Sequence, residues 1–166
     1  MSHGLLFIMM LIVFILNVLL QVFKVKVPDK FQYITITVAT AIVCLRYKLS
    51  MAVVMYLYFI VVCFIMKIHR KKAIYVLLPL ATIIPAILIY LYDKYWILLV
   101  TAMLASVVSD FIAKDTNIGI LFGVASLGFS LMYFRITGAI ALQYYYILLL
   151  VVASIVIMQR MVKCKS

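Results

Sequence analysis

The sequence predicts an all-α, polytopic integral membrane protein: a helical bundle of about seven transmembrane helices, with the N-terminus outside and the C-terminus inside. Three observations predict this fold. The 166 residues are 70% hydrophobic and 11% charged, with a mean hydropathy of +1.32, which leaves too little polar surface for a water-soluble globule. The charged residues cut the chain into seven apolar segments. The basic residues are distributed unequally between the two sides that these segments define.

The first three segments differ in how clearly they predict a span. Residues 4–23 have no basic stretch before them and are followed by Lys24 and Lys26. We therefore expect a retained membrane helix and not a cleaved signal peptide. Residues 31–45 are short for a span at 15 residues, whereas residues 49–66 are long enough.

The remaining four segments are apolar over lengths that only a helix can satisfy in lipid. Pro79 and Pro85 in the fourth predict a kink. The loops are too short to fold, so we expect one transmembrane domain over residues 1–166 and no soluble domain. We see no internal repeat in the sequence, so the repeat signature of many transporters is absent or hidden. The four segments are residues 73–92, 95–113, 118–134 and 136–159.

Charge distribution decides whether the short second segment spans. With seven spans, 11 basic residues fall on one side and 4 on the other. Without the second span, the same residues divide 8 against 7 and the asymmetry disappears. The positive-inside rule therefore favours seven spans, with the N-terminus outside and the C-terminus inside. We expect the protein to lie in a cell (inner) membrane. The four outer basic residues are Arg46, Lys48, Lys94 and Arg135.

The net charge of +11 does not indicate nucleic-acid binding, because the basic residues form short clusters between apolar runs. We expect them to contact membrane lipids, and we expect a second copy or a larger membrane complex as further partners. The three cysteines form no CxxC pair, so the sequence predicts neither a metal site nor a cofactor. No Ser/His/Asp arrangement shares one membrane depth, and His3 in the outer tail is expected to be inert.

Asp110 is the main candidate functional residue. It lies within the fifth segment, four residues before Lys114, at a depth of about 6 Å for a helical rise of about 1.5 Å per residue. A carboxylate left in lipid costs about 3 kcal/mol, so an ionisable residue inside a span is a functional candidate by default. The same spacing also allows Asp110 and Lys114 to pair on one helix surface as a structural ion pair.

Small residues next to Asp110 predict a close helix contact. They form a stripe on the fifth segment, and Gly119 and Gly123 form a GxxxG motif on the sixth. Small faces let membrane helices approach closely. We therefore expect the fifth and sixth helices to be adjacent and antiparallel, with Gly119 or Gly123 facing the stripe and Asp110 beside it. The stripe comprises Ala102, Ala105, Ser106, Ser109 and Ala113.

Over about residues 71–135 the chain resembles the YhhN family of membrane lysoplasmalogenases, through ILLVTAMLASVVSDFIAK followed by FGVASLGFSLMYF. In that family a serine-rich stretch and Gly-Asp end one helix, and the next carries Gly, Phe and then His-x-x-Tyr. Ser106 and Asp110 match the first pattern, and Gly123 and Tyr133 match the second. The family's glycine before the aspartate is Ser109 here, and its histidine falls on Ser130. The resemblance implies hydrolysis of a vinyl-ether lipid.

Three functions follow as hypotheses. The first is a divergent lysoplasmalogenase-like lipid hydrolase, in which Asp110 is catalytic and polarises water. In this hypothesis five further residues line the substrate-binding cleft: Ser106, Ser109, Asn117, Ser130 and Tyr133. The second is a small transporter or channel component, in which Asp110 binds a cation or a proton. The third is a non-catalytic subunit of a larger membrane complex, in which the small-residue faces are docking surfaces.

Overall fold

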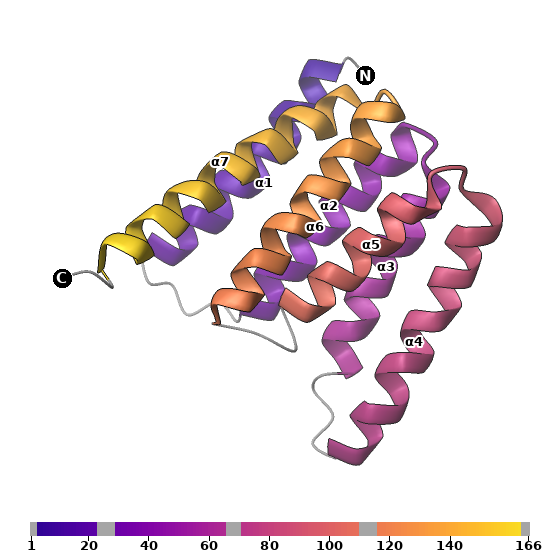
Figure 1. The fold of residues 1–166 in the computed structure, drawn as a ribbon. Helices are drawn as coiled ribbons and strands as arrows, with labels where there is room; N and C mark the ends of the chain where they lie inside the picture. The colour runs from indigo at the N-terminus through magenta and orange to yellow at the C-terminus, as the bar shows by residue number, and fades with distance from the viewer. Residues whose placement is uncertain (1–2, 23–28, 66–70, 110–115, 164–166) are drawn as a thin grey trace. The chain divides into compact units, whose positions relative to one another are not determined.

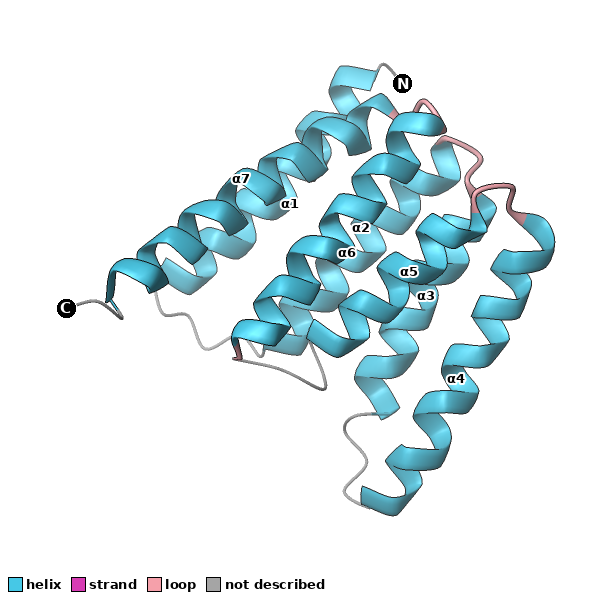
Figure 2. Ribbon diagram, viewed as in Figure 1, coloured by secondary structure: helices cyan, strands magenta, loops and turns pink. Residues whose placement is uncertain are grey.

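A computed structural model describes residues 3–22, 29–65, 71–109 and 116–163. Within these ranges the chain forms seven helices and no strand (Figure 2), which confirms the all-α prediction. One helix lies over most of each predicted segment, although the bounds differ. They are α1 (His3–Val22), α2 (Asp29–Arg46), α3 (Ser50–Ile65), α4 (Lys71–Tyr92), α5 (Trp96–Val107), α6 (Asn117–Ile136) and α7 (Ile140–Lys163).

The chain divides into two compact units, Met1–Trp96 and Ile97–Ser166. In the first unit, α1 packs against α2, α2 against α3 and α3 against α4 (Figure 1). In the second unit, α6 packs against α7 and also lies beside α5 (Figure 1). The expected single transmembrane domain stays a prediction.

Buried apolar side chains join α2 to α3 in the first unit. Val43 and Cys44 on α2 are fully buried, as are Ala52 and Val62 on α3. Cys44 is a free cysteine that packs here as a small apolar residue. This contact needs no polar group, because close packing of aliphatic side chains also holds helices together in an apolar solvent.

A pair of hydroxyl groups joins α3 to α4. Tyr58 Oη lies 2.8 Å from Thr82 Oγ1, and Thr82 Oγ1 donates to the carbonyl of Leu78 at 2.7 Å. Because a threonine hydroxyl has one proton, Tyr58 is the donor of the bond between the two helices. α4 continues as one helix from Lys71 to Tyr92 through both Pro79 and Pro85.

The same backbone motif ends α2 and α6. After α2, Leu49 N–H donates to Cys44 O and Lys48 N–H to Leu45 O, both at 3.0 Å. These two bonds define a Schellman motif, whose central residue takes the left-handed conformation. Lys48 has φ +59° there, the one positive φ among the described non-glycine residues.

The turn after α6 repeats this arrangement. Ala139 N–H donates to Phe134 O at 2.9 Å and Gly138 N–H to Arg135 O at 3.4 Å, with φ +73° at Gly138. The predicted break between the sixth and seventh helices at Arg135 is therefore wrong by about one turn. Arg135 belongs to the last turn of α6, where a cation is favourable beside the helix dipole, and Gly138 is the residue that ends the helix.

α5 begins and ends with identifiable local structure. Before it, Asp93 Oδ1 accepts the N–H of Tyr95 at 2.7 Å, an Asx turn that directs the chain into the helix. α5 was predicted to reach Ala113, but its regular part ends at Val107 and a wider π-type turn covers Val108 and Ser109. The rest of the predicted segment, from Asp110 on, lies outside the described residues.

Among the described side chains, α6 over Asn117–Ile136 is the one helix both long and apolar enough to cross a bilayer by length and composition. Only 22% of its apolar window is buried, whereas a core helix of a soluble protein would be mostly buried. Six further apolar helical stretches have 10–17 residues with described side chains: His3–Leu16, Ile34–Arg46, Ser50–Ile65, Val76–Tyr92, Trp96–Val107 and Ile140–Ile155.

Candidate functional site

Asp110 and Lys114, the centre of the predicted site, lie outside the described residues. The structure describes the helix turns that lead into and out of this segment. On the preceding side, Ser106 on α5 and Ser109 in the wide turn are both half-buried. π-type turns occur often at functional sites, and here one directly precedes Asp110.

On the following side, Thr116 caps the start of α6. Its Oγ1 accepts the N–H of Gly119 at 3.0 Å, and its backbone is extended, as a helix N-cap requires. Asn117 is the first residue of α6 and is exposed. Both ends of the segment that holds Asp110 therefore carry polar side chains.

The predicted contact between α5 and α6 is confirmed. Ser126 Oγ donates to the carbonyl of Ala102 at 2.9 Å, and a Cβ on Gly123 would lie 2.8 Å from Ser109 Oγ. The two helices are antiparallel, because moving forward along α5 from Ala102 to Ser109 means moving backward along α6. Gly123 is the glycine that faces the small-residue stripe, and Figure 1 shows α5 and α6 side by side.

One face of α6 carries a row of small and polar residues. Its members recur every three or four positions, so they lie on one side of the helix. The row consists of Gly119, Gly123, Ser126, Ser130 and Tyr133. At its far end, Ser130 is 3% and Tyr133 is 1% exposed.

The predicted site residues occupy two levels along this row. Ser109 is level with Gly123, whereas Ser130 lies seven residues further on, about 10 Å along the axis, and Tyr133 about 15 Å. Ser109 and its contact with Gly123 thus lie directly before Asp110 in the chain. Ser130 and Tyr133 lie toward the C-terminal end of α6. The cleft that would join both levels stays a prediction.

Two polar contacts were not anticipated from the sequence. Ser126 supplies the interhelical hydrogen bond; its position three residues after Gly123 is the signal that could have identified it. His3 was expected to be inert, but its Nδ1 lies 2.7 Å from Tyr47 Oη and the two rings stack at 5.5 Å. The imidazole is engaged because α1 begins beside the α2–α3 turn.

Hydroxyl groups dominate the polar chemistry of the site. Among the described residues, no group of three or more His, Cys, Asp or Glu side chains could hold a metal ion. Of the buried polar side chains that the structure describes, Ser130 belongs to the second unit, whereas Thr37 and Thr40 lie on α2 in the first unit. Hydroxyls can bind and orient a neutral polar group.

No protein-family model, no curated protein and no solved structure matches the chain. The resemblance to the YhhN family and the roles that it implies for Ser106, Asp110 and Tyr133 therefore stay predictions.

Proposed function

We propose that the chain is a multi-pass membrane protein in which all seven helices span the bilayer. The observation that supports this proposal is the apolar surface of the helices. α4 exposes aliphatic side chains along most of its described length, and Leu121 on α6 is 68% exposed. A soluble monomer rarely exposes apolar patches larger than a few hundred Å². The exposed aliphatic residues of α4 include Val76, Leu80, Ile83, Ile84, Ile87 and Leu91.

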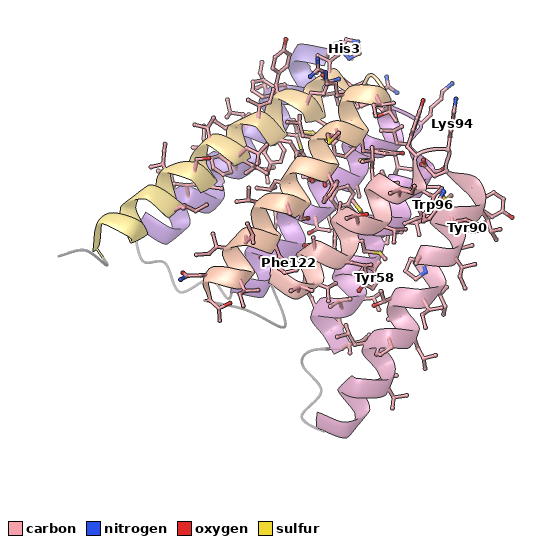
Figure 3. The ribbon with its side chains drawn as sticks, viewed as in Figure 1. His3, Tyr58, Tyr90, Lys94, Trp96 and Phe122 are labelled. Atoms are coloured by element: carbon pink, nitrogen blue, oxygen red, sulfur yellow. The ribbon has the colours of Figure 1, made fainter. Side chains whose placement is uncertain are left out.

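The placement of charge supports the same proposal. Each charged side chain that the structure describes lies in the last turn of a helix or in a connecting turn; these are Arg46, Lys48, Asp93, Lys94 and Arg135. In the first unit, the start of α1 at His3 and the end of α4 before Lys94 lie at the same end of the helices (Figure 3). Alternating directions of this kind are what successive spans require.

The proposed threading predicts the location of both termini. A reporter fused after Ser166 should read cytoplasmic, and one placed before Gly4 should read external, because the inner side would hold most of the basic residues. The protein should also remain with the membrane during alkaline carbonate extraction. Both reporters on one side would contradict seven spans, and release into the soluble fraction would contradict membrane insertion.

For the activity, we propose a lipid hydrolase that resembles the lysoplasmalogenases. Asp110 would polarise a water molecule, which adds to the vinyl-ether bond so that the adduct breaks into an aldehyde and an alcohol. The close contact of α5 with α6 supports this assignment, because it holds Ser109 directly before Asp110 against a packed surface. The test is turnover of a lysoplasmalogen, with a lysophospholipid as the comparison substrate, by the purified protein.

Transport is the second candidate, and a specific observation favours it. The same turn motif joins α2 to α3 and α6 to α7. Internally repeated helices are a feature of many transporters. Flux of protons and K⁺ into liposomes containing the purified protein separates this candidate from the hydrolase. A protein that is stable only with co-purifying partners would instead favour a subunit of a larger complex.

A further inference from the structure

The hairpins α2–α3 and α6–α7 correspond residue by residue at a constant offset of 90 positions. The two left-handed residues, Lys48 and Gly138, differ by this offset. So do the acceptors of the long Schellman bonds, Cys44 O and Phe134 O, and their donors, Leu49 and Ala139. The turns therefore share one backbone path, although they share none of these side chains.

Burial follows the same offset well beyond the turns. Over residues 40–57 and 130–147, no position is buried in one hairpin and exposed in the other. Six pairs of equivalent positions are buried in both hairpins, and the hydroxyls of Thr40 and Ser130 form one of them. Ala139 and Ala141 are fully buried, whereas their equivalents Leu49 and Met51 are half-buried. The other matched pairs are Val43 with Tyr133, Cys44 with Phe134, Ala52 with Leu142, Met55 with Tyr145 and Tyr56 with Tyr146.

In each hairpin, the first helix also contacts the helix that precedes it in the chain. In the first unit α2 packs against the preceding α1 and the following α3. In the second unit α6 contacts the preceding α5, through Ser126 and Ala102, and the following α7. The middle helix of α1–α3 and the middle helix of α5–α7 thus each contact both of their neighbours in the chain.

We propose that α1–α3 and α5–α7 are two copies of one three-helix unit that cross the membrane in the same direction, with α4 as the helix that restores this direction. The proposal rests on the seven-span threading proposed above. Three spans carry the chain from one side of the membrane to the other, so a second copy that followed at once would be inverted. One additional span, α4, returns the chain to the side where the first copy began.

The duplication has a functional consequence. Parallel repeats, related by an axis along the membrane normal, form one class of secondary transporter. A chain of two such copies joined by a single helix adds support to transport as the second candidate. The matched hydroxyls of Thr40 and Ser130 are the polar groups that both copies hold at one buried position.

Cysteine labelling tests the direction of the two copies in the full chain. Ser50→Cys and Ile140→Cys occupy equivalent exposed positions at the starts of α3 and α7, in a background of Cys44→Ala, Cys63→Ala and Cys164→Ser. An impermeant maleimide should label both in intact cells, whereas Asn117→Cys should react only after permeabilisation. Opposite sides for Ser50→Cys and Ile140→Cys would overturn this proposal and the seven-span threading together, whereas labelling on one side with a failed turn exchange, described below, would overturn the duplication alone. In that case a protein that still resists carbonate extraction remains a membrane protein, whereas a released protein contradicts both proposals.

Exchange of the turns tests the residue-by-residue register. Residues 46–50 are replaced by the residues of 136–140, which puts glycine at position 48. The control takes the residues of 137–141 and puts glycine at position 47 and alanine at position 48. The in-register exchange should melt at a higher temperature than the control, since only it supplies glycine at the left-handed position. An equal or higher melting temperature for the control would overturn the correspondence.

Discussion

At the scale of single residues, Lys48 and Gly138 show how one backbone position can be filled by unlike side chains. Both take the left-handed conformation, which glycine adopts freely and other residues adopt at a cost of about 1–2 kcal/mol. Lys48 is tolerated because two backbone hydrogen bonds of the Schellman motif define the turn. A charged side chain at this position also suits a turn at a membrane surface.

This comparison predicts opposite effects of two substitutions. Lys48→Gly should raise the free energy of unfolding by about 0.5–1 kcal/mol, because relief of the strained φ exceeds the added flexibility of the unfolded chain. Gly138→Ala should lower it by about 1 kcal/mol, because a Cβ is introduced at φ +73°. Thermal unfolding in detergent measures both. Destabilisation by Lys48→Gly would mean that the lysine side chain itself holds the turn.

Element-scale contacts explain why small residues recur on α5 and α6. Packing of these helices uses the hydroxyl of Ser126 as well as the absence of a side chain at Gly123. If the helices span a membrane as proposed, close approach and hydrogen bonding replace the hydrophobic effect as the source of helix association, since lipid chains are as apolar as leucine. The same reasoning applies to α3 and α4, where Tyr58 and Thr82 form the polar link.

A double-mutant cycle at Gly123 and Ser109 tests this contact. Alanine is favoured over glycine inside a helix by about 1 kcal/mol, but a Cβ on Gly123 would force the Ser109 hydroxyl to move. We therefore expect Gly123→Ala to change stability little in the native background. In a Ser109→Ala background it should be stabilising by about 0.5–1 kcal/mol.

Gly128→Ala is the matched control for this cycle, because no atom lies within 4 Å of its added Cβ. It should stabilise α6 equally with Ser109 or Ala at position 109. If Gly123→Ala gives the same change in both backgrounds, the two helices do not meet at Ser109, and the confirmed part of the predicted site would have to be revised.

The sequence predicted helix positions well because charged clusters interrupt apolar runs at helix ends. It failed at Arg135, where a charge lies inside the last helical turn, and at Ser126, whose role depends on a partner carbonyl on another helix. The contact of Gly123 was predictable because GxxxG spacing has a direct steric meaning. The correspondence of the two hairpins was not visible in the sequence, because the equivalent positions share backbone conformation and burial while their side chains differ.

At the scale of the whole molecule, the two proposed activities make different demands on Asp110. In a hydrolase it would act on water, whereas in a carrier it would bind a cation or a proton. Its position in the chain agrees with both, since it follows the contact of α5 with α6 directly. Only the loss of function on substitution can separate a working carboxylate from an ion pair with Lys114.

The decisive variants are Asp110→Asn and Lys114→Gln. If Asp110 only pairs with Lys114 at the membrane surface, either change should cost about 0–1 kcal/mol of stability and leave activity intact. If Asp110 is functional, Asp110→Asn should abolish activity while the protein inserts and purifies normally, because the amide keeps the shape of the side chain but can neither carry charge nor exchange a proton. Lys114→Gln should then have little effect. Both variants are measured for lysoplasmalogen turnover and for proton flux in liposomes; full activity of Asp110→Asn in the assay that the wild type passes would make the carboxylate structural.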